Sequence, residues 1–510
     1  MSELTARIRA VLDLNVASSR EEVGRHEYDG VVQDLSPSGI SSGLARLSAA
    51  RSAGPALDDP HDEAHLRAFE DLQQVTYGSL ELHRRSPLRL LDELDLAVYD
   101  KDYGPAAERA AARARHVAAW PAAIDAGLAS LDQLSAPVAQ AMLRAVRGLA
   151  AGLPPGIDPP TRDAALVAHA RLVARMERAA AEGDPSAALG AAGLSALMGT
   201  SEAATVDVPG LAEQADAERD RLLGRLRESC ALIDPARDPL ELARSLVRDH
   251  PDRAGVLTAA RDLTAQAIEF TASRDLVPYH DGTCLVDEAP ESKRWSVAMI
   301  YMNAPFEPDG PSYYYVTPPD ESWPAEQAEE WLEMFSAATL PAITVHEVAP
   351  GHFSHGRALR RAPSQVRRAL WSMAFAEGWA HYAEELCVEE GFLSEDPRFA
   401  IGVWLEALVR VTRLACALGV HAGGMTVADA ARRFEADTHL LGPAALSEAR
   451  RATFDPTYGR YTWGKLEIMR LRSRAQAAWG AGFTLQRFHR SLLELGAPPL
   501  GLIGTAVERG

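Results

Sequence analysis

The chain has 510 residues, of which 47% are hydrophobic and 24% charged, so collagen-like, low-complexity and wholly disordered chains are excluded. Lys and Arg total 52 against 71 Asp and Glu, giving a formal net charge of −19, and a chain this acidic without a basic stripe disfavours nucleic-acid partners. At about 100–200 residues per domain, the length fits two or three domains.

The first 200 residues are rich in Ala, Leu and Arg and predict one helix after another. The stretch 165–183 has the spacing of an amphipathic helix and closes on a glycine. Turn clusters at 36–39 (SPSG) and 152–160 (GLPPGIDPP) are expected to separate helices. This part carries no motif with recognisable chemistry, so residues 1–200 are interpreted as a helical scaffold or cover.

A further helix is predicted at 211–233, after which the character of the sequence changes. From 277 to 319, β-branched and aromatic residues stand between Pro and Gly, which predicts short strands. The run at 313–315 is expected to form an edge strand to which a substrate backbone could add, with Tyr314 facing opposite to its neighbours. Helices then return, so the predicted fold class is mainly α with one small β-sheet.

The segment TVHEVAPGH places His346 beside Glu347, with His352 following. In zinc peptidases, two histidines four residues apart bind one metal from one helix face, and the Glu after the first reaches the metal-bound water. Here the histidines are six apart, about 120° away from a shared face. Pro350 and Gly351 must bulge or break the helix between them, which could bring the imidazoles together. The alternative is a core histidine followed by a simple helix end.

A third candidate ligand lies in the segment FAEGWAHYAEE. Glu377, His381 and Glu384 are spaced i, i+4 and i+7 and therefore share one face of a helix. Aromatic residues in the same run indicate a buried helix, and a buried carboxylate needs a partner or a metal. The alternative is an acidic face in contact with solvent.

Together, HEVAPGH and EGWAHYAEE resemble the bacterial DUF885 family, whose pattern is HExxPGH followed by EGWxxYxE. That family is similar to zinc-dependent metallopeptidases of the gluzincin type, which implies a large helical metallopeptidase-like fold with the small sheet preceding the HExxPGH helix. The likeness continues in the segments 413–421 and 461–466 and is good from about residue 270 to 475.

The resemblance implies that His346, His352 and Glu377 bind one Zn²⁺ per chain, although Fe, Mn or Co also suit such ligands. Glu347 matches the general base of the family. The family pattern usually has an apolar residue where this chain has His381, which is therefore a fourth ligand, a partner of a ligand or a substrate contact.

The developing oxyanion of a hydrolase needs a donor besides the metal. Tyr461 is the first candidate, because a phenol donates without adding a full charge, and His421 and Arg413 follow. Arg413 could instead grip a substrate carboxylate, or these residues could be helix caps and surface pairs. Glu384 is expected to orient a ligand histidine, and His355 to lie at the surface or behind a ligand.

The sequence thus predicts a zinc-dependent hydrolase of an amide or peptide bond in a short peptide or small molecule. Residues 201–510 form the catalytic region, with a sheet at about 277–319, metal-binding helices at about 335–390 and then the helices that carry the oxyanion candidates. Metal-dependent chemistry on a small metabolite and an inactive scaffold used for binding remain alternatives. Four scattered cysteines, a first segment without a signal-peptide pattern and the lack of a long apolar run predict a cytoplasmic protein without membrane partners.

Overall fold

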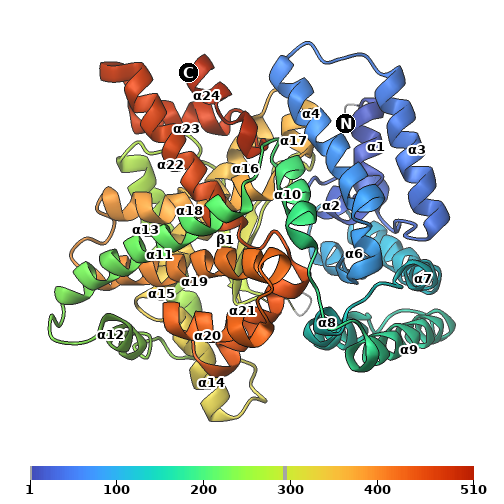
Figure 1. The fold of residues 1–510 in the computed structure, drawn as a ribbon, viewed down its shortest axis with the longest axis horizontal. Coiled ribbons are helices and arrows are strands. Elements are labelled where there is room, and N and C mark those ends of the chain that lie inside the picture. Colours follow the sequence, from blue (N-terminus) through green and yellow to red (C-terminus); the bar gives the residue numbers. More distant parts are fainter. Residues whose placement is uncertain (1–2, 291–293, 295) are drawn as a thin grey trace.

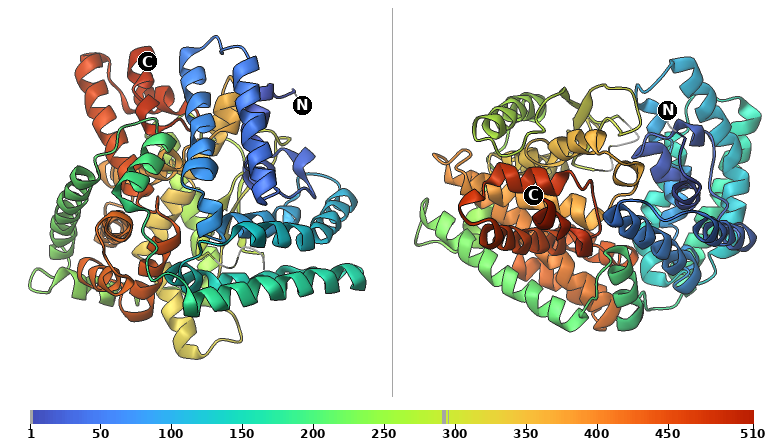
Figure 2. Two further views of the ribbon diagram at one scale, coloured as in Figure 1. Left: turned by 45° about the vertical axis from the view of Figure 1, so that its right-hand side comes forward. Right: turned by 90° about the horizontal axis from the view of Figure 1, so that it is seen from above.

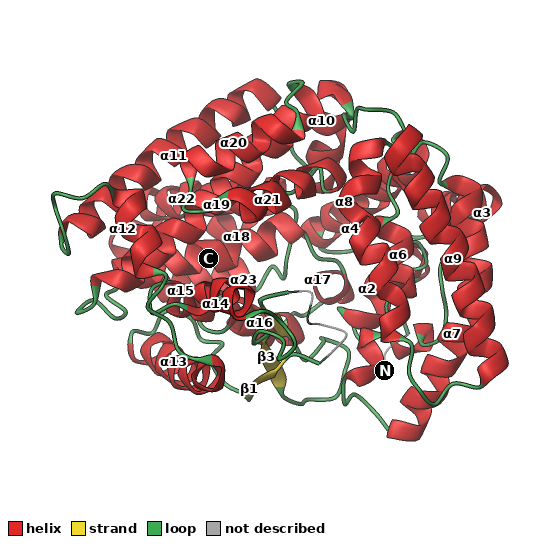
Figure 3. Ribbon diagram, turned by 90° about the horizontal axis from the view of Figure 1, so that it is seen from below, coloured by secondary structure: helices red, strands yellow, loops and turns green. Residues whose placement is uncertain are grey.

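The computed structural model describes residues 3–290, 294 and 296–510. Within these residues the chain is mainly helical with a small three-stranded sheet, as predicted (Figure 1, Figure 3). Trp295, which begins the second of the predicted strand segments, lies outside the described residues.

The first helices gather on one side of the molecule, at the right of Figure 1, and the rest of the chain forms the other side. The helices up to residue 201 are α1 (Ala6–Leu12), α2 (Val16–Glu21), α3 (Pro37–Ala53), α4 (Pro60–Gln73), α5 (Leu82–Arg85), α6 (Leu88–Leu94), α7 (Ala106–Ser130), α8 (Ala136–Gly148), α9 (Pro159–Glu182) and α10 (Gly190–Ser201).

The second side holds the sheet and the helices around it. In chain order its elements are α11 (Val208–Ala231), α12 (Pro239–Leu246), α13 (Arg253–Ser273), β1 (Cys284–Glu288), β2 (Ala298–Tyr301), β3 (Ser312–Val316), α14 (Ala325–Leu332), α15 (Thr339–Glu347), α16 (His352–Arg361), α17 (Gln365–Ala369), α18 (Met373–Glu389), α19 (Pro397–Ala422), α20 (Val427–Asp437), α21 (Gly442–Phe454), α22 (Arg460–Trp479), α23 (Leu485–Leu493) and α24 (Thr505–Arg509).

Local capping rules decide several helix boundaries. The Ser36 side chain accepts the Gly39 N–H and Pro37 occupies the first turn of α3, so the predicted turn at 36–39 is wrong and this segment starts a helix. The helix predicted at 165–183 is confirmed, since α9 ends with Gly183 as its C-cap.

The sheet has the order β1-β3-β2, with β3 parallel to β1 and antiparallel to β2. The prediction that residues 313–315 form an edge strand is therefore wrong: β3 is central, and β2 is one of the edges. The predicted alternation is confirmed, because Tyr314 is fully buried while Tyr313 and Tyr315 stack on the opposite face with ring centroids 5.5 Å apart.

Buried hydrophobic side chains form two large clusters, one drawn mostly from residues 4–179 and the other from residues 194–506. Val366, Ala369 and Leu370 join the first cluster, because α17 packs against α4 and α1 (Figure 2). The predicted boundary near residue 200 stays a prediction. No helix in the described ranges is both long and apolar enough to cross a bilayer.

Two close helix crossings fix the helices around the HExxPGH segment. A Cβ on Gly464 of α22 would lie 1.9 Å from the Ala374 carbonyl oxygen, and a Cβ on Gly378 of α18 would lie 2.5 Å from Gly464 Cα. Where α19 crosses the start of α15, a Cβ on Gly402 would lie 1.8 Å from the Ala338 carbonyl oxygen. Only glycine permits these backbones to approach so closely.

Candidate metal centre

The helix that carries the two histidines is interrupted between α15 and α16, as predicted. The Gly351 N–H donates to the Val345 carbonyl oxygen at 3.2 Å, reaching back six residues instead of the four of an α-helix. A Cβ on Gly351 would lie 1.9 Å from the His346 carbonyl oxygen. The wide turn absorbs two additional residues, so His352 meets His346 edge to face with ring centroids 4.8 Å apart.

The indole of Trp379 stabilises this interruption from α18. Its Nε1–H donates to the Pro350 carbonyl oxygen at 3.0 Å and lies 3.3 Å from the carbonyl oxygen of Gly351. Carbonyls released from helical bonding need such partners when they are buried. The EGW segment therefore contacts the PGH segment directly.

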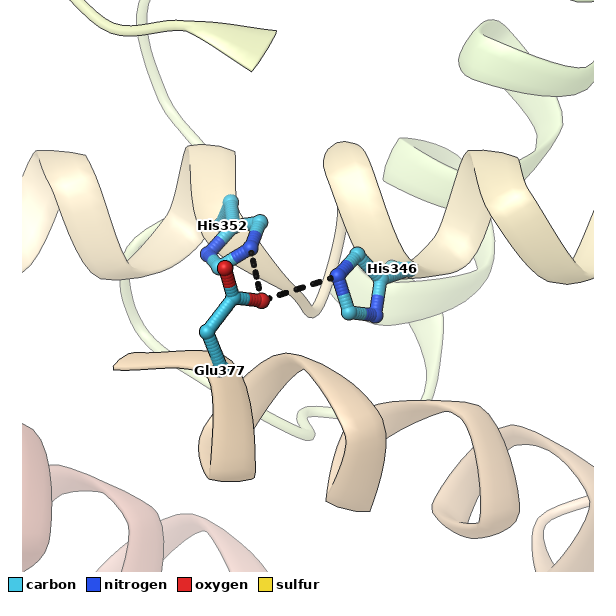
Figure 4. Close-up of side chains that lie close together, drawn as sticks. All are labelled: His346, His352 and Glu377. Atoms are coloured by element: carbon cyan, nitrogen blue, oxygen red, sulfur yellow. Dashed lines mark ion pairs between the residues drawn. The ribbon is translucent and has the colours of Figure 1, made fainter. Parts of the chain in front are cut away.

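Glu377, on α18, lies opposite both imidazoles (Figure 4). Its Oε2 is 3.5 Å from His346 Nε2 and 3.4 Å from His352 Nε2. One ligand atom from each of the three residues lies within 4.8 Å of the others. A tetrahedral zinc ion with ligands at about 2.1 Å separates its ligand atoms by about 3.4 Å. The three side chains therefore fit a zinc-sized cation.

The charges in this group depend on one another. Burial acts to lower the pKa of His346, but hydrogen bonds with Glu377 and Glu384 outweigh burial and raise it to about 9. Burial acts to raise the pKa of Glu377, yet its contacts with His346 and His352 hold it well below its usual range. A bound cation would replace the proton that the imidazoles share with this carboxylate.

Glu384 contacts His346 on the side away from Glu377, the position that its predicted role of orienting a ligand histidine requires. His346 Nδ1 lies 2.6 Å from Glu384 Oε1, which leaves Nε2 toward Glu377. The other oxygen of Glu384 accepts from Arg410 Nη1 at 3.0 Å and lies 3.2 Å from His381 Nδ1. His381 thus contacts the partner of a candidate ligand and lies outside the three-residue donor set.

The predicted general base, Glu347, touches the sheet. Its Oε2 accepts the Ile300 N–H of β2 at 2.8 Å. The neighbouring outward carbonyl, that of Ala298, accepts from Ser296 Oγ at 2.9 Å. The edge of β2 that faces away from β3 therefore runs beside Glu347.

Tyr461 lies in the first turn of α22, one turn before the contact between Gly464 and Gly378. Burial, followed by the negative charge of Glu377, raises the pKa of the Tyr461 hydroxyl. In the described part of the chain this hydroxyl makes no hydrogen bond. The Tyr461 hydroxyl is thus a neutral hydrogen-bond donor whose pKa is affected by the charge of Glu377, a candidate ligand.

The other two oxyanion candidates are engaged by the protein. Arg413 donates from Nε and Nη2 to Glu448, each at 2.8 Å, so this edge of its guanidinium is filled, while Nη1 makes no hydrogen bond within the described residues. His421 is buried with Nε2 2.7 Å from the Ala452 carbonyl oxygen. Their roles at an oxyanion stay predictions.

The structure decides between two expectations for one histidine and adds an arginine. His355 is fully buried, with Nε2 3.2 Å from the Gly496 carbonyl oxygen, so it does not lie at the surface, and its other expected position, behind a ligand, stays a prediction. Arg410 was not predicted as a site residue, although it stands between Val409 and Val411 in an apolar stretch. A charge buried there needs a partner, and that signal could have identified it.

A cavity of about 450 Å³ lies between the N-terminal helices and the starts of α18 and α22. Its wall includes Met373 and Ala374, about one turn before Glu377, and Arg460, which precedes Tyr461. The three candidate ligands do not line it, so the cavity adjoins the donor set rather than containing it.

The sequence profile of DUF885, described as a bacterial protein of unknown function, matches residues 18–507. A comparison with curated proteins finds no match. Among solved structures, a "putative lipoprotein of unknown function" from Shewanella oneidensis is 20% identical, with a TM-score of 0.78 over 98% of this chain and 97% of that one. A "putative lipoprotein" from Colwellia psychrerythraea is 17% identical, with a TM-score of 0.79 over 99% and 97%.

At these identities the likeness to the solved structures extends to the fold alone. The profile match spans nearly the whole chain and includes both motifs of the candidate metal centre. This protein therefore belongs to the DUF885 family of bacterial proteins.

Proposed function

We propose that the protein is a zinc-dependent hydrolase of an amide or peptide bond in a short peptide or small molecule. The observation that supports this most is the spacing of Glu377 Oε2 from His346 Nε2 and His352 Nε2, 3.5 and 3.4 Å, with Glu347 adjacent to the first histidine. Two imidazoles and one carboxylate leave a coordination position for water or substrate, as in catalytic zinc sites.

Zinc bound there would lower the pKa of a water toward about 7 and polarise the scissile carbonyl. Glu347 takes a proton from the attacking water and delivers it to the leaving amine. The Ile300 N–H holds one oxygen of Glu347, which leaves the other for this proton transfer. Tyr461 donates its hydroxyl to the developing oxyanion, and its raised pKa keeps that hydroxyl protonated.

The outer edge of β2 and the adjoining cavity suggest how a substrate is held. An extended peptide added to this edge would pair with the groups of Ala298 and Ile300 that Ser296 and Glu347 leave free. The cavity of about 450 Å³ begins about one turn from Glu377 and is large enough for a small-molecule group, although the candidate ligands themselves do not line it. Rapid cleavage of a full-length protein chain such as casein would contradict the proposed short substrate.

The first test measures metal per chain by elemental analysis on protein purified without a metal-affinity tag. We expect about one zinc per chain, largely lost in Glu377→Gln and retained in Glu347→Gln. Hydrolysis of short N-acylated peptides should fall by about 100-fold or more in Glu347→Gln, because general-base catalysis contributes at least that factor. Glu389→Gln, on the same helix but paired with Arg472, is the matched control and should keep both properties.

Other results would redirect the proposal. One iron or manganese per chain would favour the alternative of metal-dependent chemistry on a small metabolite. No metal, even after zinc is added, would leave the inactive scaffold used for binding. The cytoplasmic location stays a prediction; because two similar proteins are described as lipoproteins, a membrane anchor is the alternative that cell fractionation would detect.

A further inference from the structure

Arginine side chains gather around Tyr461, beside the candidate metal centre. The guanidinium carbons of Arg410, Arg413 and Arg460 lie 5.9, 5.5 and 5.9 Å from the centroid of its ring. Guanidinium groups that stack on aromatic faces are held in place while the edges that carry their N–H donors stay available. Which of these edges is still available decides what the cluster can bind.

Each of these three guanidinium groups already donates to a carboxylate of the protein. The pairs are Arg410 with Glu384 at 3.0 Å, Arg413 with Glu448 at 2.8 Å from both Nε and Nη2, and Arg460 with Asp455 at 2.8 and 2.7 Å.

A fourth arginine, Arg451 of α21, differs from the others. It lies 4.4 Å from the centroid of the Tyr458 ring, on which Arg413 also stacks at 4.8 Å. Within the described residues its one ion pair is a loose contact, with Nη2 3.6 Å from Oδ2 of Asp455. Arg460 already binds that carboxylate bidentately. In the described chain the Arg451 guanidinium makes no hydrogen bond, and 38% of its side chain is exposed.

A run of stacked side chains connects Arg451 to Tyr461. The Tyr458 ring carries both Arg451 and Arg413, and Arg413 continues onto the ring of Tyr461. The positive charge of Arg451 also opposes the effect of Glu377 on the pKa of the Tyr461 hydroxyl. Arg451 is therefore connected to Tyr461 by stacked side chains, and its charge acts on the Tyr461 hydroxyl, the proposed donor to the oxyanion.

We propose that Arg451 binds a carboxylate of the substrate, so the substrate is a short peptide or N-acyl amino acid with a free carboxylate. This inference rests on the proposed hydrolase function and narrows its substrate class. One guanidinium fork matches one carboxylate bidentately. A phosphate dianion would need further donors, and the neighbouring Arg413 and Arg460 each already hold a carboxylate of the protein bidentately on one edge. Arg451 thus takes the role that the sequence suggested for Arg413.

A matched pair of substrates tests the assignment by kinetics. N-acetyl-alanyl-alanine and its C-terminal amide would be offered to zinc-loaded wild type, Arg451→Gln and Arg450→Gln, the last being the exposed neighbour on α21. We expect the wild type and Arg450→Gln to prefer the free acid about 10- to 100-fold in kcat/KM, the range for a hydrogen-bonded charge contact. Arg451→Gln should lose this preference with little change on the amide, and Arg451→Lys should recover part of it.

Two kinetic outcomes would overturn the inference: a wild type that cleaves acid and amide equally well, or a preference that survives in Arg451→Gln. A structural role for Arg451 would instead lower the rates on both substrates together. The amide therefore reports whether the hydrolase works, independently of the carboxylate contact.

Binding measurements separate failure of this inference from failure of the proposed hydrolase. Titration calorimetry of N-acetyl-alanine into the zinc-loaded proteins needs no turnover. Binding that Arg451→Gln weakens by about tenfold or more would support the carboxylate site even if neither peptide is cleaved. Inorganic phosphate that binds as tightly through Arg451 would replace this assignment with a general anion site. Cleavage of the amide without any binding of N-acetyl-alanine would overturn the inference and leave the hydrolase intact.

Discussion

Arg410 connects the candidate ligands to Tyr461, because it contacts Glu384 and lies beside the Tyr461 ring. Burial acts to raise the pKa of Glu384, but the charges of Arg410 and His381 and the hydrogen bond with His346 hold it below its usual range. We expect Arg410→Gln to weaken zinc binding about 10- to 100-fold, since Glu384 would hold His346 less firmly. Competition with a chromophoric chelator measures this affinity.

Arg221→Gln is the matched control for this prediction. Arg221 pairs at 2.8 Å with Glu385, the next residue along α18, and contacts no candidate ligand. Its zinc affinity should stay close to that of the wild type, and Arg410→Lys should recover most of the loss. If Arg410→Gln were folded by circular dichroism and bound zinc as tightly as the wild type, Arg410 would have no part in positioning His346.

For single residues, the sequence was enough to predict some members of the candidate site but not others. Spacing and residue type brought His346 and His352 forward and left the third ligand among Glu377, His381 and Glu384; the resemblance to the family then selected Glu377. The state of Arg413 depends on Glu448, 35 residues away on another helix, so no local pattern shows that one edge of its guanidinium is already paired. Arg410 carried a local signal, a charge inside an apolar stretch, whose partner Glu384 could not be identified before the helices were placed.

Among the elements, the wide turn between α15 and α16 is the feature on which the donor set depends. In Gly351→Ala, the new Cβ would meet the His346 carbonyl oxygen at 1.9 Å and that of Val345 at 2.5 Å, so the turn must deform. We expect a loss of about 1–3 kcal/mol in the free energy of unfolding, the usual cost of overpacking, together with weaker zinc binding. Urea unfolding and the chelator competition measure the two effects.

Gly224→Ala in α11 gives the opposite expectation for the same chemical change. Nothing lies within 4 Å of a Cβ at that position, so the variant should gain up to about 1 kcal/mol from helix propensity. Equal behaviour of the two variants would mean that the turn relaxes freely around residue 351. The sequence predicted an interruption of the helix from Pro350 and Gly351, but the six-residue hydrogen bond that sets its width depends on the partner carbonyls.

The strands illustrate the same limit. Composition predicted strands in the region 277–319, and its described residues contain three. Their order could not be predicted. β3 pairs in parallel with β1 although β2 lies between them in the sequence, and such a pairing depends on the path of the connections. An aromatic run such as 313–315 suits a central strand as well as an edge.

In the whole molecule, the N-terminal part does not only cover the other side, as predicted, but also contacts the sheet region through ion pairs. Lys101 and His26 contact Glu307, in the segment after β2, at 3.0 and 3.2 Å. Lys101 Nζ also lies 4.5 Å from the centroid of the Tyr301 ring at the end of β2. The helical character of the first 200 residues was predictable from composition. This contact with the edge strand was not, because it joins residues about 200 positions apart.

Glu202 offers a test of how the two sides of the molecule are joined. It follows α10 and accepts the Ser372 hydroxyl at 2.7 Å and the Leu500 N–H at 3.0 Å. Burial raises its pKa from 4.5 to about 7, against the opposing effect of these hydrogen bonds. Below pH 4.5 both the folded and the unfolded chain hold this proton. As pH rises toward 7, the unfolded chain releases it first, so the free energy of unfolding falls by roughly 3 kcal/mol in total.

Glu202→Gln removes this titration while retaining one donor and one acceptor at the same place. We therefore expect the stability of the variant relative to the wild type to increase by roughly 3 kcal/mol between pH 4.5 and pH 8. Urea unfolding at several pH values measures the difference, in which the other titrating groups cancel. Glu182→Gln, on an exposed carboxyl at the end of α9, makes the same chemical change and should give a curve parallel to the wild type. A parallel curve for Glu202→Gln as well would mean that the pKa of Glu202 is the same in the folded and the unfolded chain, and that its contacts with Ser372 and Leu500 offset the effect of burial.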